Sequence, residues 1–117
     1  MSLSVFIQKI QNAEKVSFSD AISIISDHYI YQPTEFSNGL AEDKLTNAPG
    51  TNEGSCKIFA FAQLQQFNQT QTLSLFGDYY WIDVLNNPKG SHHKNIRNFI
   101  QYGWQGIHFK HAALTAK

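Results

Sequence analysis

Apolar residues recur at helical spacing along most of the chain, most densely near its middle. Residues 52–67, NEGSCKIFAFAQLQQF, carry apolar side chains on nearly every side of a wheel of 3.6 residues per turn. One face holds Cys56, Ala60, Leu64 and Phe67, and the opposite face holds Ile58, Phe59 and Ala62. The pattern therefore predicts a central, buried helix from Asn52 to Phe67. Small and polar residues at its start can cap the first turn: Thr51, Asn52, Gly54 and Ser55.

Shorter amphipathic patterns on both sides of this segment predict further helices. A first helix has inward positions from Leu3 to Ile10, and a second begins at Ser17 or Ser19 and stops at Pro33. After the central helix we expect a helix that is capped by Thr70 and broken at Gly77, followed by a helical turn or two over 79–85. A last helix should be capped by Ser91 and end at Gly103. Its inward residues should be Ile96, Phe99 and Ile100.

Two segments have the composition of extended chain. Residues 29–36 are aromatic and β-prone, residues 37–39 favour a turn, and residues 104–109 alternate between apolar and small or polar positions. We expect 104–109 to pair with 31–36, and we interpret 40–51 as a surface loop. The sequence thus predicts one domain over residues 1–117, of the α+β class and predominantly α-helical. In it a central buried helix is surrounded by four other helices and a small β element.

Composition and charge narrow the classes of function. Nine basic and nine acidic residues balance, and no run of Lys or Arg follows a helix or strand. A general nucleic-acid binder or a protein held on an anionic membrane needs clustered positive charge, so we expect neither kind of partner. The single cysteine excludes an internal disulfide and suits a reducing compartment. The N-terminus has no signal-peptide pattern, and the longest apolar run, 58–62, is far too short to span a membrane.

Several short motifs occur in an order that is similar to a known family. They are Pro33, Phe36, Asn38 and Gly39, the block Asn52 to Lys57, Thr72-Leu73 with Phe76-Gly77, Val84-Leu85, His93 with Asn95-Ile96-Arg97, Gly103-Trp104, and Phe109. Together they resemble the HopJ type III effector family of small bacterial proteins. The resemblance runs from the second helix to Phe109, and residues 80–83 fit it less well.

This resemblance implies an effector of a bacterial type III system, with no established enzymatic activity and no cofactor. Substrates of such systems usually begin with a mobile, Ser-rich leader, whereas here a helix is expected from about residue 3. We therefore expect a resident role in the bacterial cytoplasm ahead of secretion into a host cell.

Cys56 is the sharpest candidate for chemistry. Near the first turn of a helix, free amides and the helix dipole favour the thiolate, and Lys57 or a protonated His93 would add to this. A small cysteine hydrolase or transferase would use Cys56 as nucleophile, His93 as base, and Asn95 or Asp83 to orient the base. The competing interpretation is a buried, unreactive thiol, and we favour it because free cysteines are commonly core residues.

Histidines offer no convincing metal site. His92, His93, His108 and His111 supply imidazoles, but 108–111 is expected to be extended, where positions i and i+3 point to opposite faces. No acidic residue stands at a matching spacing, so we interpret these side chains as surface histidines and predict no metal.

The remaining polar motif residues suggest a binding site without catalysis. The candidate ligand-binding residues are Asn38, Asn52, Glu53, Ser55, Arg97 and Trp104. A scaffold can bring such loop and helix-start residues together in one cleft, with His93 and Asn95 beside them. We therefore predict a binding or interaction module that uses the face built from NEGSCK and HKNIR. Its partner would be an unknown protein or a small anionic ligand, because Arg97 suits a carboxylate or phosphate. Alternatively, Arg97 pairs with Glu53 and Trp104 belongs to the core.

Overall fold

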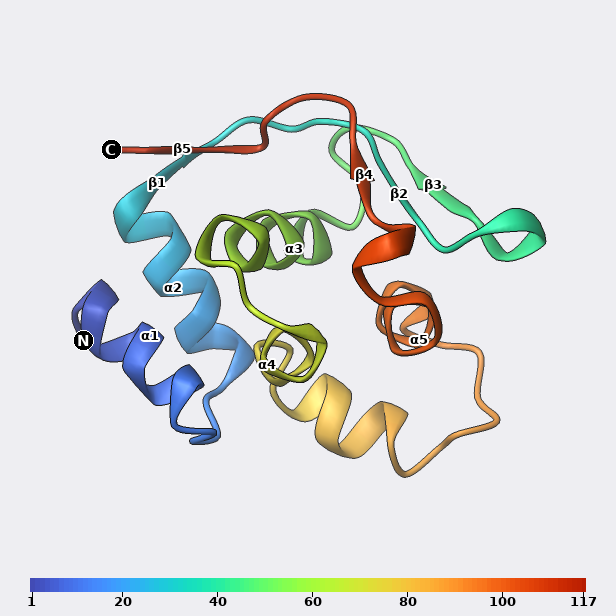
Figure 1. Ribbon diagram of the computed structural model, residues 1–117, viewed down its shortest axis with the longest axis horizontal. Coiled ribbons are helices and arrows are strands. Elements are labelled where there is room, and N and C mark those ends of the chain that lie inside the picture. The colour runs from blue at the N-terminus through green and yellow to red at the C-terminus, as the bar shows by residue number, and fades with distance from the viewer.

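Helix α3 (Glu53–Gln65) lies at the centre of the computed structural model, which describes residues 1–117, and the other elements surround it (Figure 1). In chain order these are α1 (Leu3–Gln11), α2 (Phe18–His28), β1 (Tyr29–Tyr31), β2 (Phe36–Asn38), η1 (Ala41–Asp43), β3 (Leu45–Asn47), α3, α4 (Gln69–Ser74), η2 (Tyr79–Val84), α5 (Lys94–Tyr102), η3 (Gly103–Gly106), β4 (His108–Phe109) and β5 (Leu114–Ala116). Elements η1 and η3 are 3₁₀-helices, and η2 is a π-helix.

The core is built on α3. Its residues 56 and 58–62 are all buried, and Phe59 packs its ring against Phe36, Phe76, Phe99 and Trp104 at centroid distances of 5.0–6.4 Å. The predicted central buried helix is confirmed. The inward position expected for Leu64 is wrong, because this side chain lies on the outer face of α3 and is 54% exposed.

The helix starts follow local hydrogen bonding. Ser17 caps α2 by accepting from the Asp20 amide at 3.0 Å, which confirms one of the two predicted caps. The cap predicted at Thr70 is wrong, because Asn68 and Gln71 form a reciprocal capping box at the start of α4.

The last helix differs from expectation in its cap residue and in one of its three inward positions. Its cap is His93 rather than Ser91, and His93 adopts the left-handed conformation with φ 55° without a side-chain capping bond. Ile100, expected inside, is 39% exposed. Gly103 follows the helix with φ +61°, a value that glycine adopts without strain.

Two small antiparallel sheets run along one side of α3 (Figure 1). In the sheet β3-β2-β4, Phe36 pairs with Phe109 and Ser37 with His108. The pairing predicted between 31–36 and 104–109 is therefore confirmed only where these segments end, at Phe36 and Phe109. Asn38 ends β2 instead of forming a turn, and Trp104 lies in η3 instead of a strand. The loop predicted over 40–51 is wrong in part, because η1 and β3 lie within it.

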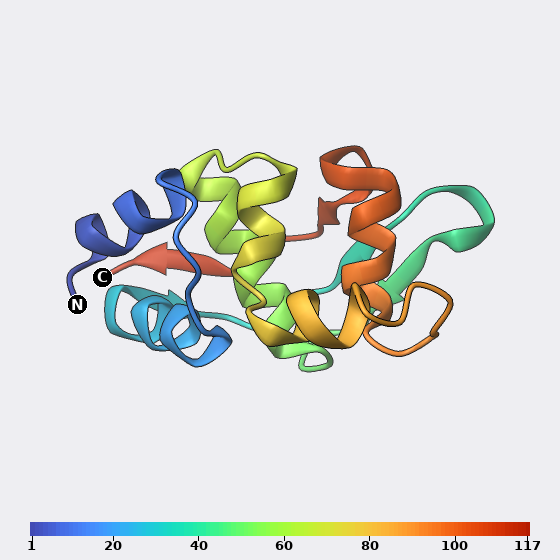
Figure 2. The ribbon, with the colours of Figure 1, turned by 90° about the horizontal axis from the view of Figure 1, so that it is seen from below.

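The sheet β1-β5 was not predicted. It pairs Tyr29–Tyr31 with Leu114–Ala116, and both chain termini lie at the same end of the long axis (Figure 2). The fold is α+β and predominantly helical, as expected, and one cluster of 22 buried residues forms its core. None of the helices has the length and hydrophobicity needed to cross a lipid bilayer.

Candidate functional site

Four buried asparagines join β2, β3 and α5. The Asn38 side chain donates to the Asn95 carbonyl at 2.8 Å, and Asn47 and Asn95 exchange side-chain hydrogen bonds at 2.9 and 3.2 Å. Asn98 donates to the Asn38 carbonyl at 3.0 Å, and Asn52, at the start of α3, donates to Asn47 Oδ1 at 2.7 Å. Asn38 and Asn95 are 0% and 6% exposed, so these two predicted site residues hold the fold together.

Cys56 does not meet the other members of the predicted catalytic set. It is 1% exposed, and burial raises the pKa of its thiol, while a hydrogen bond from the Tyr31 hydroxyl lowers it by less. His93 Nε2 instead lies 3.1 Å from Asp83 Oδ2, and the Asn95 amide bonds Asn47. A nucleophile needs an accessible thiolate with a base in reach. The geometry therefore favours the structural thiol.

The other predicted ligand-binding residues lie in separate places. Arg97 donates to the carbonyls of Asn87 and His92 and forms no ion pair with Glu53. Trp104 donates from Nε1 to the Phe67 carbonyl at 2.8 Å and packs in the core.

At the start of α3, Ser55 is half-buried without a side-chain hydrogen bond, and Glu53 is exposed. The pKa of Tyr31 is raised by burial and then by its hydrogen bond to Glu53. The expected convergence of all these side chains on one cleft is thus wrong.

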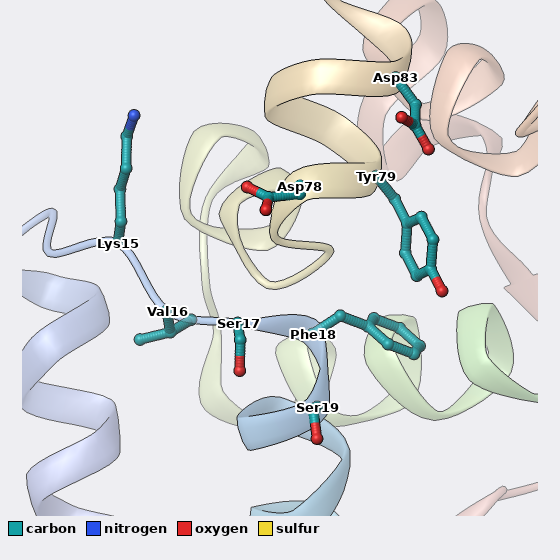
Figure 3. A pocket seen from close by; sticks show the side chains of 8 residues that line it. All are labelled: Lys15, Val16, Ser17, Phe18, Ser19, Asp78, Tyr79 and Asp83. Carbon is teal, nitrogen blue, oxygen red and sulfur yellow. The ribbon is translucent and has the colours of Figure 1, made fainter.

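A surface groove of about 470 Å³ nevertheless lies next to the NEGSCK and HKNIR segments, which contact two of its lining residues (Figure 3). We call it the acidic groove. One wall is the end of the α1–α2 connection with the first residues of α2, and the other is formed by Asp78 and by residues of η2. The lining residues are Lys15, Val16, Ser17, Phe18, Ser19, Asp78, Tyr79 and Asp83. Figure 3 shows the rings of Phe18 and Tyr79 close together at one end with Asp83 beside Tyr79, Lys15 at the other end, and Asp78 between them.

Two glycines leave the space that Phe18 occupies beside this groove. A Cβ at Gly54, in the first turn of α3, would lie 2.9 Å from the Phe18 ring. A Cβ at Gly77, where φ is +59°, would lie 2.7 Å from the Phe18 amide nitrogen. Tyr79 packs edge-on to Phe18 at 5.1 Å between centroids and also lies 5.1 Å from the His93 ring. Contacts with Phe18 and Tyr79 therefore bring both motif segments to the groove.

The groove carries an excess of negative charge. Its lining holds two aspartates and one lysine. Asp83 Oδ2 hydrogen-bonds His93 Nε2, with side chains 43% and 29% exposed, and Asp78 is exposed without a cationic partner. The Lys15 ammonium lies 4.7 Å from the centroid of the Trp81 ring and pairs with neither carboxylate. Carboxylates beside aromatic rings suit an ammonium or guanidinium group. No three His, Cys, Asp or Glu side chains gather to hold a metal ion.

Comparison with known proteins places the chain in a family. The model of the HopJ type III effector protein family matches residues 3–114. The chain belongs to this family. It is similar to a solved structure described as the crystal structure of unknown function protein VPA0580, with 42% identity and a TM-score of 0.93. That match covers 100% of this chain and 95% of the other. No curated protein matches the chain.

Sequence reasoning identified the motif segments of this HopJ domain but missed most residues that line its groove. Tyr79 was treated only as a helix-packing residue and Asp83 only as an orienter, while Phe18 and Asp78 were not considered. The available signals were the two glycines, which permit close approach, and the run GDYYWID, in which two carboxylates flank three consecutive aromatic side chains and an isoleucine. The π-helix that presents this run could not be inferred from periodicity.

Proposed function

We propose that this HopJ-family chain is a binding module whose acidic groove holds a lysine or arginine side chain of a partner protein. One observation carries the proposal: Asp78 and Asp83 flank the exposed Tyr79 ring, and no lysine or arginine of the chain pairs with either carboxylate. An incoming cation gains charge-assisted hydrogen bonds and an aromatic face at the same time. The function is recognition and requires no catalytic group.

A protein segment fits this groove better than a small anion does. The groove has two carboxylates against one lysine, and that lysine is already placed over Trp81. The carboxylates of Asp78 and Asp83 would therefore repel an anion. Arg97, the cation first considered for an anionic ligand, lies outside the acidic groove and binds loop carbonyls.

The test is a titration of ¹⁵N-labelled protein with three short peptides, acetylated and amidated, that differ at one central position: lysine, norleucine or glutamate. We expect only the lysine peptide to shift the amides of the groove, with a response that weakens as salt increases. Asp78→Asn should lower its affinity about two- to fivefold, the value of an exposed ion pair.

The matched control is Asp27→Asn, which removes an exposed carboxylate of α2 that does not line the groove. It should leave the affinity unchanged. Equal binding of the norleucine peptide, or equal effects of the two Asn variants, would show that the groove carboxylates do not recognise the cation.

The family description suggests a second place where the groove could bind its partner, namely a host cell that the protein reaches through type III secretion. We propose that the chain acts in the bacterial cytoplasm, and that export would deliver the folded groove to a host partner. A translocation reporter fused to the C-terminus, compared between a strain with a working type III system and one without, separates these settings. A signal in host cells that depends on the secretion system would refute a purely resident role.

A further inference from the structure

A second groove, of about 320 Å³, lies between the end of η2 and α5 and shares no lining residue with the acidic groove. We call it the Arg97 groove. Its lining residues are Val84, Leu85, Pro88, Arg97, Ile100 and Gln101. Val84 and Leu85 at the end of the π-helix form one side of it, whereas Tyr79 and Asp83 of the same helix line the acidic groove. Nothing in the proposed function uses this second surface.

Aliphatic side chains are unusually open to solvent around this groove. Leu85 is 45% exposed and Ile100 is 39% exposed, and Ile82 on η2 is 50% exposed. The same helix α5 buries Ile96 and Phe99, so Ile100 lies outside an otherwise well-formed core face. Apolar side chains that gather at a rimmed surface groove are typical of an interaction site.

Arg97 is the only charged side chain in the lining, and it is held in a fixed position. Its Nε donates to the His92 carbonyl at 2.6 Å, and Nη1 donates to the Asn87 carbonyl at 2.8 Å, while Nη2 lies 3.3 Å from His92 Nδ1. These bonds use three of the five guanidinium N–H groups and orient the cation, but no carboxylate of the chain neutralises it. Arg97 is half-buried, and its guanidinium has no carboxylate partner.

We propose that the Arg97 groove docks a segment of a partner protein in which an aliphatic side chain stands next to a carboxylate. Charge complementarity decides the occupant: the aliphatic side chain lies against Leu85 and Ile100, and the carboxylate accepts from the free N–H groups of Arg97. Arginine matches a carboxylate with two parallel donors, and the apolar walls exclude water from that pair. The acidic groove selects the opposite charge, so the two sites do not compete for one kind of segment.

The test is an NMR titration of ¹⁵N-labelled protein with an acetylated, amidated eight-residue peptide of alternating leucine and glutamate. Matched peptides carry glutamine or lysine in place of glutamate. We expect the glutamate peptide to shift the Val84, Leu85 and Gln101 amides and the Arg97 Nε–H signal. The glutamine peptide should bind about tenfold more weakly, since a charge-assisted pair beside apolar walls exceeds an exposed one. The lysine peptide should not bind at this surface.

Three variants make the result specific. Ile100→Asp places a carboxylate in the groove and should abolish binding, whereas Leu64→Asp makes the same change at an exposed leucine of α3 and should leave binding unchanged. Arg97→Met keeps the aliphatic stem and should remove the difference between the glutamate and glutamine peptides. A role limited to holding the 87–92 loop would not produce that loss of discrimination.

The alternatives give opposite results. If the three peptides bind equally, if shifts map outside the groove, or if no peptide shifts these signals, the proposal is wrong. The other possible occupant is a second copy of this chain, and sedimentation of the unliganded protein tests for it. If the protein is a dimer that Ile100→Asp converts to a monomer, the groove belongs to that second copy and the proposal is wrong.

Discussion

At the scale of single residues, Cys56 shows that desolvation outweighs helix position in setting side-chain chemistry. It lies in the first turns of α3, where the helix dipole favours the thiolate. It is nevertheless 1% exposed, and burial raises its pKa above the ordinary value of 9.0. Its position in the helix could be predicted from the sequence. Its burial depends on β1 and the segment after it, whose packing on α3 no local pattern reveals.

The first prediction concerns alkylation of this thiol and the stability that depends on it. Iodoacetamide should modify Cys56 in unfolded protein at about pH 9 and spare it in folded protein.

Because the pKa of the Cys56 thiol is higher in the folded state, the thiol releases its proton at a lower pH in the unfolded state. The free energy of unfolding should therefore be constant below the unfolded pKa and fall as the pH rises above it. Denaturant titrations between pH 7 and about pH 10 measure this fall, and Cys56→Ala should reduce it. Rapid alkylation of folded protein would contradict the buried-thiol interpretation.

Gly77 supports the second prediction, because it combines positive φ with a close backbone contact. In Gly77→Ala the new Cβ meets the Phe18 amide nitrogen, which cannot move without shifting the start of α2. Gly50→Ala is the control: its φ is +82°, but no atom lies within 4 Å of the added Cβ. We expect Gly50→Ala to cost about 1 kcal/mol and Gly77→Ala about 2–4 kcal/mol of unfolding free energy. Equal losses in urea titrations would show that backbone conformation alone matters at Gly77.

At the scale of elements, the sequence pattern located the helices better than most of their caps and strands. Several polar residues lie near each helix start. The one that caps the helix is decided by reciprocal hydrogen bonds, such as those between Asn68 and Gln71. Strands of two or three residues carry too little alternation to be recognised. The π-helix η2 has no sequence signature, yet it contributes to both grooves. Local patterns thus gave the helical part of the fold, while the exact surfaces depend on geometry between elements.

The asparagine cluster gives the third prediction, since it joins β2, β3 and α5. Asn95→Ala removes three buried side-chain hydrogen bonds, one with Asn38 and two with Asn47, while Asn38 keeps its bond to the backbone carbonyl of residue 95. We expect a loss of about 2–4 kcal/mol, which corresponds to the three lost hydrogen bonds together with a small cavity. Thermal unfolding followed by circular dichroism measures it. Asn86→Ala, at an exposed position, should leave the melting temperature unchanged. A similar melting temperature for both variants would show that the cluster contributes little to stability.

At the scale of the whole molecule, the site could be predicted only in outline. The motif segments around Gly54 and His93 do come close to one groove, as expected from their family resemblance. They reach it through contacts with Phe18 and Tyr79, which stand far from them in the sequence. Arg97, the residue expected to bind an anion, does not line this groove, because its side chain is directed to the 87–92 loop. Such orientations follow from tertiary packing and have no counterpart in motif spacing.

The last prediction tests whether residues 1–117 unfold as one unit. β5 closes the fold on β1: Leu114 is 5% exposed, the Gln32 amide donates to the Ala113 carbonyl at 2.8 Å, and the Lys117 amide donates to the His28 carbonyl at 3.1 Å. Leu114→Ala should cost about 2–4 kcal/mol, a large share of the stability of a small domain, whereas Thr115→Ala on the exposed side should cost little.

In a single cooperative domain, that loss must appear everywhere at once. The fluorescence of Trp81 and Trp104, which belong to η2 and η3, and the circular dichroism of the helices should then shift to the same lower denaturant midpoint in Leu114→Ala. The reason is that α3 connects β5 to the remaining core through its buried residues, so no part retains a complete core when the end strand is weakened. If the tryptophan transition stayed at its original midpoint while the helical signal moved, the terminal sheet would be a separate folding unit and the single-domain prediction would fail.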